Sequence, residues 1–504
     1  MAGGQAASCF RDAVTIPPDQ AETAAFLRDL AGADPVETHI SLVFVGTDTV
    51  WKLKKAVRLS FLDFSVLEDR RKFIGREFEL NAHGAPGLYR DIVPVVRRED
   101  GTLSLGGEGT VVDWVLRMSR VPSSDFLNIM AQAGRLDPPL LDAIADAVAA
   151  YHAQSIPLPE ACADMRWMAR GNVTAARDAG LPPEAIDAWG AEIERTLSAL
   201  EPWLRQRVRD GFVRRAHGDL HLGNICLWRG QPTLFDALEF DEALATIDVG
   251  YDLAFLLMDL DRRVGRSASN RAMNRYIART GDAALVRGMP AFLSLRALVR
   301  AHVSARSGDA RAGKSYLTAA LAYLRPPPPF AIAIGGLPGT GKSTVARLLA
   351  PDLGASPGAL IVRSDEIRKR QSGVSPEQRL PPAAYTSEAG RSVFETLAAT
   401  LRIAAEAGQC VIADATFLSV GHRAMVRQAC MAAGVPFRGF WLSAPMNTLE
   451  RRVATRVGDA SDATVEVLRS AAANDPGPLD WTPIDASDAA SAADRIRNLL
   501  PSES

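Results

Sequence analysis

The chain has 504 residues, of which 47% are hydrophobic and 23% charged, and its formal net charge is −2. This length exceeds what one hydrophobic core supports, so we predict two or three domains of ordinary globular composition. The near-neutral charge argues against nucleic-acid binding driven by bulk electrostatics, although a local basic patch remains compatible with it.

The cysteine content and the hydropathy of the chain indicate the cellular compartment of the protein. The five cysteines are scattered and include no C-x-x-C pair, which favours a reducing environment and argues against a disulfide framework or a zinc site. Residues 1–20 lack a charged segment followed by an apolar run, so we expect no signal peptide. No apolar run approaches the roughly 20 residues of a membrane span. We therefore expect a cytoplasmic protein with no membrane partner, and the sequence leaves the oligomeric state open.

A run of four prolines marks the clearest candidate for a domain boundary, which we call the proline seam. Residues 325–329 read Arg-Pro-Pro-Pro-Pro, which cannot continue a helix and forms a stiff spacer. We predict a linker here, between one domain at 35–324 and another at 330–504. Residues 1–34 are then an N-terminal extension.

The first predicted domain changes character along its length. Its early part reads as strands with one helix, and its later part as mostly helical. The predicted strands are 40–45, 49–54, 91–97 and 111–118, the early helix is 68–81, and the helical part is 125–324. A β-rich small lobe followed by an α-rich large lobe predicts an α+β, kinase-like bilobal fold.

One polar motif in the large lobe has the spacing that phosphoryl transfer requires. Residues 217–224 read His-Gly-Asp-Leu-His-Leu-Gly-Asn, and a strand-like segment then leads to Asp236. In this pattern Asp219 can accept the proton of a substrate hydroxyl, while the Asn224 amide oxygen and the Asp236 carboxylate can hold Mg²⁺. The structural alternative is that the two aspartates only cap turns.

The motif resembles that of the aminoglycoside phosphotransferase-like kinases, which share H-G-D-x-x-x-x-N and a later metal-binding aspartate. The resemblance covers about residues 35–310. It implies that Asp219 is the catalytic base and that Asn224 and Asp236 are metal ligands.

A kinase of this kind also needs a strand lysine paired with a helix glutamate to fix the nucleotide phosphates. Strand alternation places Lys52 and Lys54 on one face. We predict Lys52 for this role, with Lys54 as the alternative and Glu77 as the partner. Exposed charges on a strand or helix are the structural alternative. No G-x-G-x-x-G loop precedes Lys52, and the turn before its strand contains only Gly46. A degenerate active site is therefore an alternative.

The strongest motif lies after the proline seam. It matches G-x-x-x-x-G-K-[ST] between a buried strand at 330–334 and an amphipathic helix at 345–349, and it consists of Gly336, Leu337, Pro338, Gly339, Thr340, Gly341, Lys342, Ser343 and Thr344. Backbone N–H groups of such a loop converge on phosphates. Lys342 can reach the β- and γ-phosphates of ATP, and the Ser343 hydroxyl can ligate Mg²⁺.

The rest of this domain alternates strands with helices. Strands are predicted at 359–363, 410–413 and 438–442, which favours a parallel α/β sheet with its ligand at the carboxyl ends of the strands. Asp365 and Asp414 follow two of these ends. Asp365 also suits a helix N-cap, a role compatible with catalysis.

This domain resembles the small P-loop kinases related to polynucleotide kinase, gluconate kinase and zeta-type toxins, over about residues 330–500. The resemblance implies that Asp365 is the base toward the acceptor hydroxyl, Arg368 a substrate clamp, and Asp414 a residue near the metal. Arg452 and Arg456, predicted one helical turn apart, resemble lid arginines that neutralise the transferred phosphoryl group.

The joined architecture resembles bacterial two-part proteins in which an aminoglycoside phosphotransferase-like domain precedes an AAA-type P-loop kinase domain. We predict a bifunctional ATP-dependent phosphotransferase with two ATP·Mg²⁺ sites, acting on hydroxyls of small molecules or on a nucleic-acid end. The alternative is one catalytic P-loop kinase regulated by a nucleotide-sensing, pseudokinase-like N-terminal domain.

A motor-type ATPase is disfavoured because alanine (Ala415), not glutamate, follows Asp414. The acceptors are not readable from these motifs.

Overall fold

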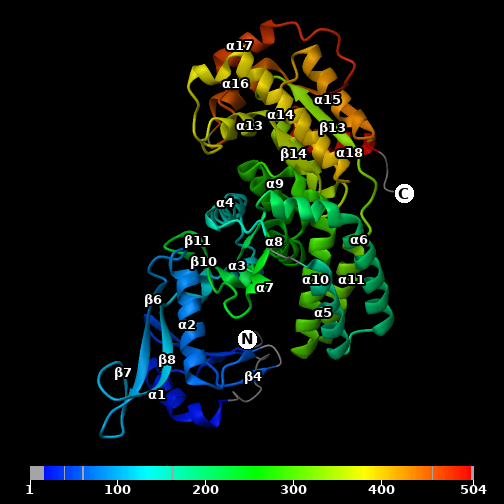
Figure 1. Cartoon of the computed structure of the whole chain (residues 1–504). Helices are drawn as coiled ribbons and strands as arrows, with labels where there is room; N and C mark the ends of the chain where they lie inside the picture. The colour runs from blue at the N-terminus through cyan, green and yellow to red at the C-terminus, as the bar shows by residue number, and fades with distance from the viewer. Residues whose placement is uncertain (1–15, 39, 60–61, 161–163, 457, 501–504) are drawn as a thin grey trace, which may run out of the picture. The chain divides into compact units, whose positions relative to one another are not determined.

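The computed structural model describes residues 16–38, 40–59, 62–160, 164–456 and 458–500 (Figure 1). By internal contacts the chain divides into two compact units: unit 1 is Met1–Ala133 with Arg215–Ile247, and unit 2 is Gly134–Arg214 with Asp248–Ser504. This division differs from the predicted boundary at the proline seam, because the helices of the predicted large lobe group with the P-loop part. The domain boundaries therefore remain a prediction.

Unit 1 contains a six-stranded antiparallel sheet in the order β1-β2-β3-β8-β6-β7. The strands are β1 (Val36–Glu37), β2 (Ser41–Val45), β3 (Thr49–Lys54), β6 (Tyr89–Arg97), β7 (Leu103–Leu105) and β8 (Thr110–Ser119), with a small β4 (Arg58–Leu59) and β5 (Leu62–Asp63) hairpin beside them. The four strands predicted here are all present.

Two helices cover the two faces of this sheet. On one face α1 (Ala21–Ala31) packs Leu27 against Leu42 and Leu53, all fully buried. On the other face α2 (Leu67–Ala82) packs Ile74 against Leu116. Strand alternation turns the residues on either side of Leu53 toward the α2 face. The helix α1 falls within the predicted N-terminal extension, yet it is part of this core.

The remaining elements of unit 1 are short. They are α3 (Leu127–Gln132), the antiparallel pair β10 (Ile225–Trp228) and β11 (Gln231–Leu234), and α7 (Glu242–Ala245). The hairpin β10-β11 separates the residues of the predicted polar motif from Asp236.

The first part of unit 2 is helical, as the sequence predicts. Its helices are α4 (Pro138–Gln154), α5 (Met165–Asp178), α6 (Pro183–Arg209), α8 (Val249–Arg263), α9 (Arg266–Thr280), α10 (Met289–Arg306) and α11 (Ala310–Tyr323), and β9 (Val213–Arg215) and β12 (Thr246–Asp248) lie at the changes of unit. Charged pairs are buried among them: Arg207 contacts both Asp248 and Asp282. Asp248 also caps α8 by accepting from the Gly250 N–H at 2.7 Å.

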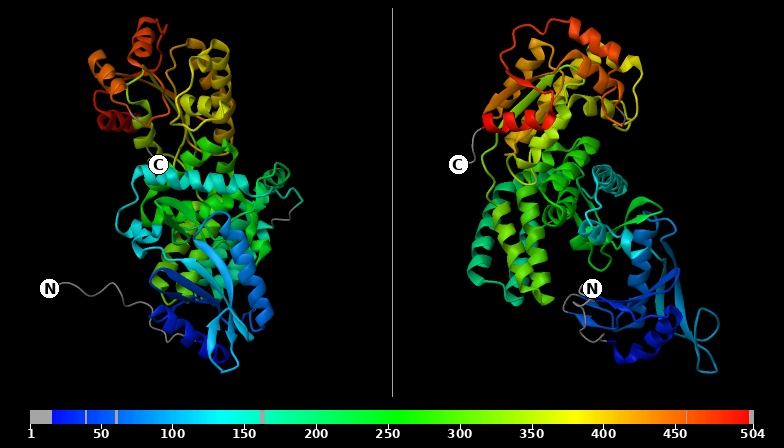
Figure 2. Two further views of the ribbon diagram at one scale, coloured as in Figure 1. Left: turned by 90° about the vertical axis from the view of Figure 1, so that its left-hand side faces the viewer. Right: turned by 180° about the vertical axis from the view of Figure 1, so that it is seen from behind.

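The second part of unit 2 is a five-stranded, fully parallel sheet in the order β14-β15-β13-β16-β17. Its elements are β13 (Ala331–Gly336), α12 (Lys342–Leu349), β14 (Leu360–Arg363), α13 (Ser364–Gln371), α14 (Ser387–Glu406), β15 (Val411–Asp414), α15 (Val420–Ala432), β16 (Phe437–Ser443), α16 (Met446–Ala454), α17 (Val465–Ala473), β17 (Thr482–Asp485) and α18 (Ala489–Leu499). Figure 2 shows helices on both faces of this sheet. The predicted parallel α/β fold is confirmed.

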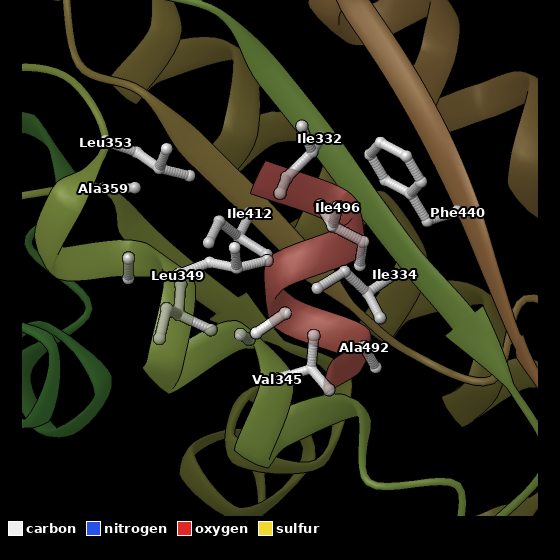
Figure 3. Packing of buried hydrophobic residues seen from close by; sticks show 14 of the residues in the cluster. Ile332, Ile334, Val345, Leu349, Leu353, Ala359, Ile412, Phe440, Ala492 and Ile496 are labelled. Atoms are coloured by element: carbon white, nitrogen blue, oxygen red, sulfur yellow. The ribbon is translucent and has the colours of Figure 1, made fainter. Parts of the chain in front are cut away.

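The core of this part joins the P-loop helix to the end of the chain. Figure 3 shows Ile496 of α18 beside Ile334 of β13 and near Val345 and Leu349 of α12, and all four side chains are fully buried. α18 therefore helps to hold the strand and the helix that flank the P-loop. None of the helices in the described residues is both long and apolar enough to traverse a bilayer.

Candidate active sites

Unit 1 brings the predicted strand lysine and helix glutamate into contact. The Lys52 Nζ lies 2.7 Å from Glu77 Oε1 and 2.6 Å from Asp236 Oδ1. Lys54 lies on the same face, 2.6 Å from Glu77 Oε2, and donates to Glu239. Lys52 alone of these two lysines joins the glutamate to the predicted metal-binding aspartate, so the geometry favours it over Lys54.

These charges are buried together, and burial and charge act in opposite directions on their pKa values. Burial alone would raise the pKa of Glu77, but Lys52 and Lys54 outweigh it and lower that pKa to about 2. Burial raises the pKa of Glu239, and the lysines offset this only in part. For Lys52, burial is outweighed by Asp236 and Glu77, so its pKa rises well above the ordinary lysine value. Lys52 thus stays charged in the folded protein.

The polar motif forms a tight loop around Asp219. The Asn224 side-chain N–H₂ donates to the Asp219 carboxylate and to its carbonyl oxygen, each at 2.9 Å. The His217 Nε2 lies 2.9 Å from the Phe235 carbonyl oxygen, which can only accept, so Nε2 carries the proton. His217 thereby ties the loop to the residue that precedes Asp236. This is a bracing role, without direct chemistry.

The Asp236 backbone is held in an unusual conformation. Its φ is +61°, in the left-handed region that non-glycine residues seldom adopt. The Asp236 N–H donates to the Tyr89 hydroxyl, and the next N–H, of Ala237, donates to Asn81 Oδ1, each at 3.0 Å. The side chains of Asp219 and Asp236 are 43% and 40% exposed, whereas Glu77 is fully buried. The two carboxylates can therefore meet a ligand.

In unit 2 the glycines of the P-loop are needed by its geometry. Gly336 has φ +142° and Gly339 has φ +86°. An added Cβ at Gly336 would lie 2.5 Å from the Leu442 carbonyl oxygen, and one at Gly339 would lie 2.8 Å from that of Leu449. The loop therefore packs directly on backbone from β16 and α16, which only glycine permits.

The cation and hydroxyl of the P-loop are held next to the predicted acidic residues. The Lys342 Nζ donates to the carbonyl oxygens of Gly336 and Leu337 at 2.9 and 3.0 Å. The Ser343 hydroxyl donates to Asp414 Oδ2 at 2.6 Å. Burial lowers the pKa of Lys342, although Asp414 and Asp365 oppose this shift.

One cavity of about 880 Å³ collects the predicted site of this unit. Its lining includes the predicted residues Lys342, Ser343, Thr344, Asp365, Arg368, Asp414, Arg452 and Arg456. Burial, with a contribution from Asp414, raises the pKa of Asp365 above the ordinary aspartate value, against the opposing charges of Arg363 and Lys342. A carboxylate with a raised pKa beside a phosphate-binding loop suits a proton acceptor.

The structural alternative for Asp365 and the predicted helical spacing of Arg452 and Arg456 are both wrong. Asp365 is not the N-cap of α13, because Arg363 occupies that position and Asp365 is the second helical residue. Arg452 and Arg456 are not one helical turn apart, because α16 ends at Ala454. The chain leaves the helix there and continues to Asp459, which is held by Arg363 at 2.8 Å.

Sequence reasoning missed Arg363. This buried residue at the end of β14 contacts Asp414 at 3.2 Å, Glu366 at 2.9 Å and Asp459. Burial alone would raise the pKa of Asp459, but Arg363 outweighs it and the value falls to about 2. The available signal was position, because Arg363 ends a predicted strand two residues before Asp365.

A second group that sequence reasoning missed lies around the predicted Arg368 and consists of Tyr385, Lys369 and Asp462. The Arg368 guanidinium donates to the Ala384 carbonyl oxygen at 2.8 Å and lies over the Tyr385 ring. The Tyr385 hydroxyl donates to Asp462 at 2.6 Å, and Lys369 pairs with the same carboxylate at 2.7 Å. Asp462 therefore connects the segment after α16 to α13 and to the segment between α13 and α14.

The donor atoms suit a hard divalent cation in both units. Asn224 and Asp236 offer amide and carboxylate oxygens, and Ser343 and Asp414 offer a hydroxyl and a carboxylate. These are the ligand types that Mg²⁺ takes in phosphate-binding sites. The described residues contain no cluster of three or more His, Cys, Asp or Glu side chains that could hold a metal ion.

Comparison with known proteins divides the chain in two. Residues 42–291 match the family model described as "Phosphotransferase enzyme family", and residues 332–475 match the model described as "AAA domain". An uncharacterized protein of Mycobacterium tuberculosis is 29% identical over 470 residues, which cover 89% of this chain and 90% of that protein. The adenylyl-sulfate kinase of Myxococcus xanthus is 30% identical over 123 residues, 24% of this chain and 62% of that enzyme.

Two solved structures are similar to part of this chain. The ethanolamine kinase of Plasmodium vivax is 9% identical and covers 57% of this chain and 81% of its own, with a TM-score of 0.37. A gluconokinase of Sinorhizobium meliloti is 18% identical and covers 34% of this chain and 95% of its own, with a TM-score of 0.24.

Proposed function

The chain joins a phosphotransferase-family domain to an AAA-type P-loop domain and is a kinase-type phosphotransferase; on that premise we propose that it transfers the γ-phosphoryl group of ATP at two separate sites. The observation that carries the proposal is that each unit assembles a lysine and acidic oxygens from distant segments. Lys52 meets Glu77 and Asp236 in unit 1. Lys342, Ser343 and Asp365 line one cavity in unit 2.

At the first site Asp219 is the base. Its carboxylate is oriented by Asn224 and is exposed enough to accept the proton of an acceptor hydroxyl. Lys52 contacts the nucleotide phosphates, and Glu77 holds its ammonium group in place. Mg²⁺ on Asn224 and Asp236 would neutralise phosphate charge.

At the second site Asp365 is the base and Lys342 contacts the transferred phosphoryl group. Arg368 and Arg456 supply positive charge to the cavity. Arg452 donates to the carbonyl oxygens of Ala486 at 3.0 Å and Ser487 at 2.6 Å, so bracing the P-loop side of the cavity is part of its role. Mg²⁺ on Ser343 and Asp414 would again neutralise phosphate charge.

Calorimetric titration with a non-hydrolysable ATP analogue and Mg²⁺ tests the two-site proposal. We expect two sites in the wild type, one in Lys342→Ala and one in Lys52→Met. Each variant removes a cation from one phosphate site and leaves the other unit untouched. Lys314→Ala, an exposed lysine on α11, is the matched control and should keep both sites.

A single site in the wild type that disappears in Lys342→Ala would overturn the two-site proposal. That outcome fits the alternative in which unit 1 senses or scaffolds without nucleotide turnover. The absence of a glycine-rich loop favours this alternative, since only Gly46 lies in the turn between β2 and β3.

Removing each base separates binding from chemistry. We expect Asp219→Ala and Asp365→Ala each to lower one transfer activity by about 10²- to 10⁴-fold while the affinity for the ATP analogue stays within about twofold. Asp29→Ala, on an exposed face of α1, is the control. Retained transfer in either variant would remove that residue as the base.

The acceptor is a hydroxyl of a small molecule or a nucleic-acid end. Adenylyl sulfate is the first acceptor to test at the second site, because the adenylyl-sulfate kinase of Myxococcus xanthus matches part of this chain. Radiolabelled ATP with a pool of sugars, sugar acids and 5′-hydroxyl oligonucleotides extends the search to both sites.

A further inference from the structure

The outer edge of the P-loop sheet is closed by side chains from α9. β14 is an edge strand, and its Leu360 N–H donates inward to the carbonyl oxygen of Cys410, the residue before β15. The next N–H, of Ile361, points outward and donates to Asn274 Oδ1 at 2.6 Å. The side-chain N–H₂ groups of Asn270 and Asn274 donate to the Ala359 carbonyl oxygen at 3.0 and 3.2 Å. Two asparagines thus occupy the place of a missing strand.

This contact is close and buried. Asn270 is 2% exposed. A Cβ on Gly358, which has φ +123°, would lie 2.8 Å from Asn270 Nδ2 and 2.4 Å from the Ala350 carbonyl oxygen. Glycine at this position lets the strand approach the helix. Figure 1 shows α9 directly next to β14, within unit 2.

A second contact from α9 reaches the loop that follows α13. Arg275, 12% exposed, pairs with Asp146 of α4 at 2.6 Å and with Glu377 at 2.8 Å. Burial alone would lower the pKa of Arg275, but its hydrogen bonds to the two carboxylates outweigh this and raise it. Arg275 and Glu377 both line the P-loop cavity. The segment between α13 and α14 is therefore anchored at Glu377 by a residue outside the AAA-type domain.

Both contacts lead directly to the proposed second site. β14 ends at Arg363, which pairs with Asp414, the acceptor of the Ser343 hydroxyl. Asp365 follows two residues later on α13. A shift of the strand edge would move Arg363 and Asp365 together, because no flexible segment separates them from β14.

We propose that α9 contributes to phosphoryl transfer by the P-loop kinase. Asn274 and the Arg275–Glu377 pair are positioning residues for transfer at Asp365. The proposal rests on the function proposed for the second site. It assigns a catalytic contribution to a helix that the AAA-type domain model at 332–475 does not include. It also makes the P-loop kinase dependent on the phosphotransferase-family segment that supplies α9.

Amide hydrogen exchange in the full-length protein tests the strand contact without any assay of activity. In Asn274→Ala the Ile361 N–H loses its acceptor, so we expect its exchange to be about tenfold faster. Asn274→Asp keeps an acceptor for Ile361 and should restore its protection, although the donor to Ala359 is lost. Asn498→Ala, at an exposed position of α18, is the control. Unchanged exchange in Asn274→Ala would overturn the strand contact.

Kinetics test the consequence for catalysis. MgATP turnover at the second site is measured in the Asp219→Ala background, which silences the first site. We expect Asn274→Ala and Glu377→Gln each to lower kcat about tenfold with KM for MgATP unchanged within twofold, because neither residue touches the P-loop. Glu450→Gln removes an ion pair between α16 and Arg469 of α17 and should retain wild-type kcat.

The outcomes distinguish this inference from the function on which it rests. If Lys342→Ala leaves turnover unchanged, the proposed function of the second site fails. If Lys342→Ala abolishes turnover while Asn274→Ala and Glu377→Gln behave like Glu450→Gln, the positioning role of α9 is overturned.

Discussion

At the scale of residues, the first site is a chain of alternating charges. Asp236, Lys52, Glu77, Lys54 and Glu239 follow one another in contact. Burial would neutralise isolated members of such a set, but each lysine lies between two carboxylates, so opposite charges compensate one another. The chain runs from a buried end at Glu239 to an exposed end at Asp236, where a ligand can enter.

Loss of Glu77 should destabilise unit 1. Glu77→Gln leaves two buried lysines with one carboxylate fewer, so we expect the free energy of unfolding to fall by about 3–5 kcal/mol at pH 7. Denaturant unfolding followed by tryptophan fluorescence measures this. Glu79→Gln, on the exposed side of the same helix, is the control and should change stability by less than about 0.5 kcal/mol.

The pH dependence of this effect has a defined sign. The pKa of Glu77 is about 2 in the folded protein, below the ordinary value of 4.5. Its contribution to stability is therefore complete above pH 4.5 and is lost as the pH falls through about 2. The stability difference between wild type and Glu77→Gln should shrink over this range. A difference independent of pH would contradict the charge-based account.

At the scale of elements, α18 packs against the strand and the helix that flank the P-loop. It lies beyond the matched AAA-type segment, which ends at residue 475, yet Ile496 packs in the core beside β13 and α12 (Figure 3). Its contacts are with the strand before and the helix after the P-loop. The position of this loop therefore depends on the last helix of the chain.

Truncation of Ile496 should unfold this core more readily. We expect Ile496→Ala to lower the free energy of unfolding by about 2–5 kcal/mol, because the side chain is fully buried and leaves a cavity. The midpoint of the transition reported by Trp481 in denaturant measures the effect. Leu499→Ala, on the same helix but 42% exposed, should cost less than about 1 kcal/mol. Equal costs would contradict the packing described for α18.

At the scale of the whole molecule, each proposed site lies within one unit. Lys52, Glu77, Asp219, Asn224 and Asp236 all belong to unit 1, although the chain enters unit 2 between the second and third of them. The P-loop site lies in unit 2 together with the helices of the predicted large lobe. Family boundaries and compact units thus divide the same chain differently, and α9 belongs to the phosphotransferase match and to the P-loop unit at once.

Much of both sites follows from the sequence alone. The P-loop and the spacing of Asp219, Asn224 and Asp236 are local patterns, because each P-loop residue lies on one short segment and only the β10-β11 hairpin separates Asn224 from Asp236. The strand alternation that places Lys52 and Lys54 on one face is equally local, since it follows from backbone geometry. The kinase-like and parallel α/β fold classes follow from the order of such segments.

Tertiary structure decided what depends on contacts between distant segments. The contact of Lys52, and not Lys54, with Asp236 depends on where the segment after β11 meets β3. α16 ends at Ala454, so Arg456 lies outside the helix, and Asp459 beyond it pairs with Arg363 from the distant strand β14. The hydrogen bonds from Asn274 to the edge of β14 cannot be predicted from the local sequence. An asparagine on a helix face looks like an exposed polar residue unless the position of the strand is known. Sequence periodicity encodes backbone geometry, whereas side-chain partners are set by packing.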